Sequence, residues 1–215
     1  MARMSGLAHL AERRGLGRHG VGWCPTTTLS WMGISFLIAF AGAAIVVAVF
    51  GAGSRGTELG LKWTARWSFL LFWLAYAGTA MATLFGPRFA GLARRGRDLG
   101  LAFASAQLVH VGFVLWLYHI ATEPIGDMSF FWVGVLCAYL LALFSLPQLH
   151  DVLGQRLWRI LRTIAVEYIA LVFASDFIFL PLQVGKYPRS SLPFALMLVS
   201  GASLRIAAFV RRHRS

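Results

Sequence analysis

The sequence predicts an all-α membrane protein, a six-transmembrane-helix bundle with both termini in the cytoplasm. Three observations lead to this prediction. The 215 residues are 58% hydrophobic and 13% charged, whereas an ordinary soluble domain is about 25% charged. Six apolar runs approach the roughly 20 residues that cross a bilayer as a helix. The basic residues are concentrated in segments that a six-span arrangement places on one side of the membrane.

These runs divide the chain into three parts. Residues 1–28 are polar and are expected to form a cytoplasmic N-terminal segment, either solvated or carrying a short surface helix. Residues 29–210 form the transmembrane domain, and its spans should be helices because backbone amides inside lipid must be paired within each segment. Residues 211–215 form a basic cytoplasmic tail. The six predicted spans are 29–51, 66–85, 99–121, 128–149, 157–180 and 192–210.

The distribution of arginine and lysine sets the predicted orientation. It puts fourteen basic residues on the inner side and five on the outer side, a bias that marks the cytoplasmic side of membrane proteins. The inner residues are Arg3, Arg13, Arg14, Arg18, Arg88, Arg94, Arg95, Arg97, Arg156, Arg159, Arg162, Arg211, Arg212 and Arg214. The outer residues are Arg55, Lys62, Arg66, Lys186 and Arg189. The loop with Glu123 and Asp127 has no basic residue and is expected outside.

The net charge of +12 has a topological explanation. In a soluble protein such a charge would suggest nucleic acid as the partner. Here the arginines lie between long apolar runs, so we expect the lipid bilayer, and not nucleic acid, as the partner. Cys24 and Cys137 lack the spacing of a metal site, and no metal is expected.

Five polar side chains inside the predicted spans are the candidates for chemistry. Ionisable groups at membrane depth are costly and mark functional sites by default. His110, near the middle of the third span, could instead have a purely structural role, as a neutral ring that is hydrogen-bonded to Gln107 or to a hydroxyl inside the bundle. The candidates are Gln107, His110, His119, Glu167 and Asp176.

The spacing of these groups predicts how they pair. Spans three and five run in the same direction, and a rise of about 1.5 Å per residue puts His110 and Glu167 at similar depths. We therefore expect these two to share one buried polar site. His119 and Asp176 each follow nine residues later and define a second level near the outer boundary. Nine residues turn a helix about half a turn out of phase, so at most one level lies on the direct interface between the two spans.

Two segments resemble a known family. The run Arg94-Arg95 … Leu99-Gly100-Leu101-x-Phe103 … Ala106-x-Leu108-x-His110 is similar to the third helix of the ferric reductase-like transmembrane superfamily. The run 153–162, Leu-Gly-Gln-Arg-Leu-Trp-Arg-Ile-Leu-Arg, resembles that family's entry into helix five. Within the superfamily, the chain looks most like the haem-binding membrane subunit of the bacterial periplasmic methionine sulfoxide reductase system.

The resemblance implies a haem b clamped between helices three and five, and it puts His110 at a haem-ligand position. His119 is a weaker candidate, because its spacing from His110 does not match the family's second ligand. The helix-five ligand positions read Leu161 and Ala174, and the fifth span contains no histidine. The resemblance also implies a multi-pass protein of a bacterial inner membrane.

Three functions remain open at this point. The first is a divergent ferric reductase-like protein without the bis-His haem, acting as a membrane partner subunit. The second is a haem b electron-transfer subunit, which would pass electrons from a quinone or flavoprotein to an external acceptor and need a soluble or membrane redox partner. If active in that way, it would belong to the oxidoreductases. The third is a proton or solute carrier that uses Glu167 and Asp176.

Overall fold

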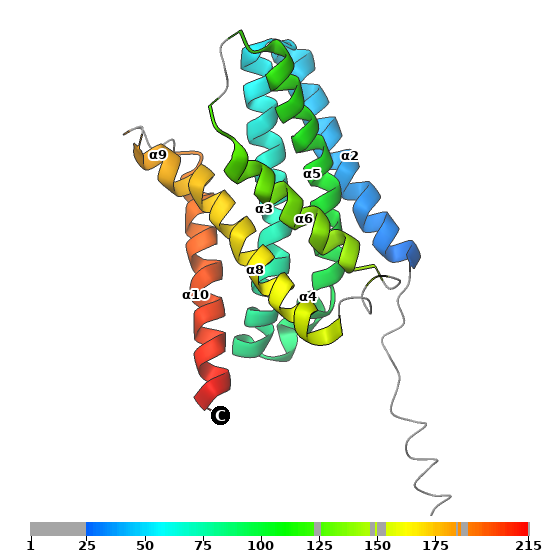
Figure 1. Cartoon of the computed structure of the whole chain (residues 1–215), viewed down its shortest axis with the longest axis vertical. Helices are drawn as coiled ribbons and strands as arrows, with labels where there is room; N and C mark the ends of the chain where they lie inside the picture. Colours follow the sequence, from blue (N-terminus) through cyan, green and yellow to red (C-terminus); the bar gives the residue numbers. More distant parts are fainter. Residues whose placement is uncertain are drawn as a thin grey trace, which may run out of the picture.

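The computed structural model describes residues 25–122, 126–146, 149, 154–183, 185 and 189–214. This part of the chain is helical and contains no strand. Most of the expected N-terminal segment, Glu123 of the predicted outer loop, Lys186 and the last tail residue lie outside the described residues. The elements in order (Figure 1) are α2 (Pro25–Phe50), α3 (Ser54–Phe85), η1 (Pro87–Phe89), α4 (Ala90–Arg94), α5 (Gly96–Ile120), α6 (Ser129–Phe144), α8 (Gly154–Ala174), η2 (Ser175–Phe179), α9 (Leu180–Gln183) and α10 (Leu192–Arg214).

Five helices in the described ranges are long and apolar enough to cross a membrane. This result supports the prediction of a multi-pass helical membrane protein. The fourth predicted span, 128–149, is shorter than expected: α6 has 16 residues, about 24 Å of helix against a bilayer core of about 30 Å. The helix ends at Phe144, three residues before Pro147 in the sequence, and proline disfavours helical backbone in the residue that precedes it. The long helices are Thr26–Phe50, Ser54–Phe85, Gly96–Ile120, Gly154–Gln183 and Leu192–Arg214.

The second span is longer than its apolar run. We expected it to begin at residue 66, but α3 begins at Ser54 and includes polar residues that precede the run. Glu58 and Lys62 stand four residues apart and form an ion pair of 2.5 Å on its exposed face. Such a pair supports helix in water, so the helix extends beyond the segment that hydropathy marks.

The core forms around α3, which packs against α2, α5 and α10. Figure 1 shows α2, α3 and α5 side by side, with α8 running obliquely across α3 and α6 beside it. Aromatic rings fill the crossing. Phe69 of α3 is fully buried and meets Phe173 and Phe177 edge-on, with ring centroids 5.2 and 5.1 Å away. These contacts fix α8 and η2 against α3.

Two glycines allow helices to approach closely. A Cβ atom on Gly60 would overlap the ring of Phe113, at the crossing of α3 and α5. A Cβ atom on Gly134 would lie 2.8 Å from Cγ2 of Val172, at the crossing of α6 and α8. Small residues commonly have this role where membrane helices pack.

Polar contacts between helices accompany this packing. The hydroxyl of Thr28 on α2 donates to Asp98 at the start of α5 across 2.7 Å. The indole N–H of Trp73 on α3 donates to the carbonyl of Met197 on α10 across 2.6 Å. Lipid offers these groups no partner, so such bonds help to set which helices are neighbours.

The basic end of α10 lies against the end of α3. Arg211 donates to the carbonyls of Thr83 and Leu84 at 3.1 and 3.0 Å, and Arg212 donates to the hydroxyl of Thr83 at 2.9 Å. Free carbonyls at a helix C-terminus attract cations. Figure 1 shows α4, the beginning of α8 and the C-terminus at this same end of the bundle. The segments rich in arginine are therefore gathered at one end.

At the opposite end, Asp127 precedes α6. Its carboxylate accepts hydrogen bonds from the backbone N–H of Ser129 at 2.9 Å and from the Ser129 hydroxyl at 3.0 Å. These bonds favour the ionised carboxylate and hold the pKa of Asp127 below its usual range, the backbone bond contributing most.

Candidate functional site

His110 lies inside the bundle, on the face of α5 that turns toward α3 and α6. Its side chain is 9% exposed. Nδ1 lies 2.9 Å from the hydroxyl oxygen of Thr64 on α3. The ring of Phe131 on α6 approaches the imidazole edge-on, with centroids 5.8 Å apart. The alternative of a histidine bonded to a neighbouring hydroxyl is thus the arrangement found.

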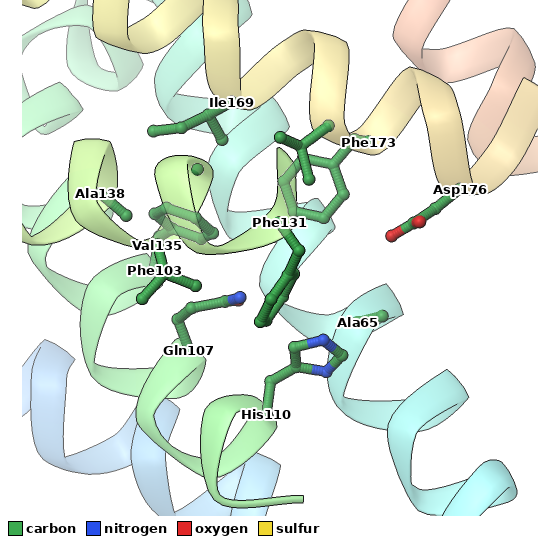
Figure 2. A pocket seen from close by; sticks show the side chains of 12 residues that line it. Ala65, Phe103, Gln107, His110, Phe131, Val135, Ala138, Ile169, Phe173 and Asp176 are labelled. Atoms are coloured by element: carbon green, nitrogen blue, oxygen red, sulfur yellow. The ribbon is translucent and has the colours of Figure 1, made fainter. Parts of the chain in front are cut away.

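A small cavity of about 20 Å³ adjoins His110. Figure 2 shows Gln107 and His110 reaching toward it from α5, and Asp176 pointing toward it from the far side. The remaining lining is apolar. It consists of Ala65, Phe103, Phe131, Gly134, Val135, Ala138, Ile169, Val172 and Phe173.

Gln107 stands one helical turn before His110, on the same face of α5. Its side chain is 8% exposed, and among the described residues no hydrogen-bond partner is found for its buried Oε1 atom. A buried polar atom without a partner is costly, and such atoms are commonly satisfied by ordered water. Gln107 therefore belongs to the cavity and is not bonded to His110 directly.

Asp176 shares the cavity with His110, although the sequence had suggested that it lies at the level of His119. The aspartate lies in η2, a π-helical turn that continues α8. Such turns are rare and frequently occur at functional sites. Asp176 is exposed on the bundle surface and also lines the cavity, so it stands at the cavity mouth. His119 lies apart, exposed in the last turn of α5 against the ring of Trp116.

The prediction that Glu167 and His110 share one site is wrong. Glu167 accepts a hydrogen bond from the hydroxyl of Tyr76 at 3.0 Å and pairs with Arg205 of α10 at 2.5 Å. Arg205 also lies over the ring of Tyr76, 4.4 Å from its centroid. The side chains of Glu167 and Arg205 are 48% and 33% exposed. Glu167 therefore belongs to an ion pair near the surface, away from the cavity.

The half-turn phase difference explains which carboxylate faces His110. Glu167 and Asp176 stand nine residues apart on one continuous helix and so point to opposite sides. The spacing argument allowed at most one level at the interface, whereas the structure brings together His110 of one level and Asp176 of the other. Because α8 crosses α3 obliquely (Figure 1), equal residue counts along α5 and α8 do not give equal depths.

The residues around His110 do not fit a haem. The hydrogen bond at Nδ1 leaves Nε2 available for a ligand, but the surroundings lack space, and among the described residues His110 is the one histidine that lines the cavity. The cavity holds about 20 Å³, whereas large ligands occupy pockets of several hundred Å³ or more, on the order of 300–1,000 Å³. From α8 the cavity receives Ile169, Val172 and Phe173, and neither Leu161 nor Ala174 lines it.

The site contains residues that the sequence reasoning missed. Thr64 carried no signal, because threonine is common in membrane helices. Arg205 could have been found from the sequence, because it is an arginine inside an apolar run, and charged residues within membrane helices usually pair with a group of opposite charge. Tyr76 could be recognised only once α3, α8 and α10 were known to meet.

Comparison with known proteins gives no match to any family model, curated protein or solved structure. Within the described ranges, no group of three or more histidine, cysteine or acidic side chains is placed to hold a metal ion.

Proposed function

We propose that this chain is a multi-pass membrane subunit that assembles with a second membrane protein through the face of α8 and α10 that carries Glu167 and Arg205. One observation supports this proposal above all. An ion pair stands half-exposed on the surface of two apolar helices.

Lipid is a poor environment for such a pair. Hydrocarbon can neither donate nor accept a hydrogen bond, so exposed charge at membrane depth is costly. Large apolar side chains stand within one helical turn of the pair along α8 and α10, among them Ile164, Leu171 and Ile206, all exposed. A partner helix with a hydroxyl or amide side chain would cover this apolar surface and satisfy the remaining polar groups of the pair.

The proposal includes six spans with cytoplasmic termini. In this arrangement α6 serves as the sixth span, and the bilayer thins locally to match its length. The gathering of Arg211, Arg212, α4 and the start of α8 at one end of the bundle supports a single cytoplasmic face.

The family assignment remains part of the proposal. The chain would be a divergent ferric reductase-like protein of a bacterial inner membrane, without the bis-His haem. The position of His110 supports it, since this residue faces α6 and α8 from α5. The filled space around His110 argues against the electron-transfer alternative. In the carrier alternative, Glu167 is held by Arg205, so Asp176 alone remains for proton chemistry.

Site-specific photo-crosslinking in native membranes tests the proposal. A photoreactive residue at Ile164 or Leu171 flanks Glu167, and one at Leu37 on the exposed face of α2 serves as the matched control. We expect one membrane protein, identified by mass spectrometry, to be linked from both α8 positions and not from Leu37. Glu167→Gln combined with Arg205→Gln should reduce that product severalfold. Lipid adducts alone, or equal yields at all three positions, would contradict the proposal, and a product made of two copies of this chain would replace the partner with a homodimer.

A further inference from the structure

The hydrogen bonds around Thr64 favour one position for the proton on the imidazole of neutral His110. Within its own helix, the Thr64 hydroxyl lies 2.9 Å from the carbonyl of Gly60 and 3.1 Å from that of Leu61. A hydroxyl has one proton to donate, and both carbonyls can only accept it. We infer that the Thr64 hydroxyl donates to these carbonyls and accepts from Nδ1–H of His110 across the 2.9 Å contact.

We assign neutral His110 the tautomer with the proton on Nδ1. Nε2 then carries a lone pair, and no titratable group of α3 or α6 lines the cavity beside it. Phe131 of α6 offers an aromatic ring, and Arg66 of α3 is engaged with Ser190 and Phe194. The acidic group that lines the cavity is Asp176 from η2.

The cavity has the size and polarity for one water molecule. Its room of about 20 Å³ exceeds the roughly 10–15 Å³ that one water needs. A buried water also needs two or more polar partners. The Nε2 lone pair of His110 and the amide of Gln107 supply them, and Gln107 is more than nine-tenths buried and points into the space.

We propose that His110, Gln107 and Asp176 form a proton-binding site in which one water links His110 to the cavity mouth. A proton from external water first binds a carboxylate oxygen of Asp176. It then passes through the bridging water, which receives one proton and releases another, to the lone pair of Nε2. An N–H bond forms on the imidazole, which becomes an imidazolium, and Asp176 is again a carboxylate.

The geometry suits both the neutral and the protonated imidazole of His110. The bond from Nδ1–H to Thr64 is the same before and after proton uptake, so the ring need not turn. The negative charge restored on Asp176 stabilises the imidazolium that forms. This site does not depend on the proposed partner, because the partner face lies on the opposite side of α8.

Solid-state NMR of protein with ¹⁵N-labelled histidine in lipid vesicles tests the site. The signal of His110 is obtained by difference from His110→Gln or, should that variant fail to fold, from a chain in which His110 is the one remaining histidine. We expect a neutral ring protonated at Nδ1, magnetisation transfer to that ring from water, and imidazolium on acidification. A ring protonated at Nε2, or one without water contact, would overturn the proposal.

Two variants that each remove one negative charge complete the test. Asp176→Asn should lower the ratio of imidazolium to neutral His110 at acidic pH by about tenfold, the effect of losing one nearby opposite charge. Asp127→Asn, in the loop before α6, should leave this ratio unchanged. Equal ratios in the two variants would contradict the role of Asp176. Cross-linking from α8 should be unaffected in both variants, so the result is independent of assembly.

Discussion

The carboxylate of Glu167 on α8 and the guanidinium of Arg205 on α10 lie 2.5 Å apart, and Tyr76 of α3 completes this contact between three helices. Each side chain offsets the charge of the other, although the pair stays partly exposed on the helix surface. It also removes Glu167 from the surroundings of His110, where its position in the sequence had suggested it would lie.

The pairing predicts a specific pattern of couplings. Glu167→Leu and Arg205→Leu should each destabilise the protein, because each strands the opposite charge. The double variant should be more stable than the sum of the singles by about 0.5–1.5 kcal/mol, the range found for polar contacts between membrane helices. Unfolding in detergent measures this cycle. The changes in the free energy of unfolding caused by Glu167→Leu and His110→Leu should add within about 0.5 kcal/mol. A larger deviation from additivity would mean that these two side chains do share one site.

The helices were largely predictable because one physical requirement determines them. Backbone in lipid must be paired internally, so each long apolar run predicts a helix, and the ends of α5 and α10 fall close to the ends of their runs. The start of α3 was missed, because its first turns are polar and extend beyond the run. The length of α6 was overestimated, because apolar residues continue past the point where its helix ends.

The sequence named the polar residues of the candidate site, but it could not tell which of them contact one another. The cost of polar groups at membrane depth singled out Gln107, His110 and Asp176, which line one cavity in the structure. Which residues meet depends on the tilt and rotation of the helices. Contacts between rings such as Phe69 and Phe173 set that tilt and rotation. Counting residues along each helix does not include these contacts. A count along α8 therefore could not choose between its two carboxylates.

The bond between Thr64 and His110 should contribute measurably to stability. Thr64→Val keeps the shape of the side chain but removes the hydroxyl oxygen that faces Nδ1 of His110, which should cost about 1–3 kcal/mol. Thr64→Ser keeps the oxygen and should retain most of the stability. Thr163→Val is the matched control: Thr163 bonds back to Arg159 on the exposed face of α8, so its loss should cost less than about 0.5 kcal/mol. Equal costs for Thr64→Val and Thr163→Val in thermal unfolding would refute the bond.

Gly134 should be sensitive to the addition of one methyl group. Gly134→Ala places Cβ against Val172 and should push α6 from α8, at a cost of about 1–3 kcal/mol. Gly112→Ala on α5, where a Cβ meets nothing within 4 Å, should be neutral or gain up to about 1 kcal/mol in helix propensity. Val172→Ala should partly rescue Gly134→Ala in unfolding experiments. The absence of rescue would show that the two helices do not meet at this point.

The orientation can be tested by cysteine accessibility in intact cells. Starting from a chain without Cys24 and Cys137, single cysteines at Gly96 and His213 should be shielded from an impermeant reagent until the membrane is opened. A cysteine at Gly126 should react from outside directly. Labelling of the Gly96 position from outside would reverse the proposed orientation. Labelling of the His213 position from outside, with Gly96 still shielded, would mean that α6 does not cross the membrane.

Haem binding is the sharpest test of the family assignment. Protein produced with ample haem should show at most weak, substoichiometric b-type absorbance in a reduced-minus-oxidised spectrum. The reason is geometric: Phe131, Ile169 and Phe173 occupy the space beside His110, and no histidine stands on α8 to bind the opposite side. A full complement of low-spin haem would instead require α6 and α8 to move away from α5. In that event His110→Ala should abolish the spectrum while His119→Ala, exposed at the end of α5, leaves it intact, and the electron-transfer function would replace the one proposed here.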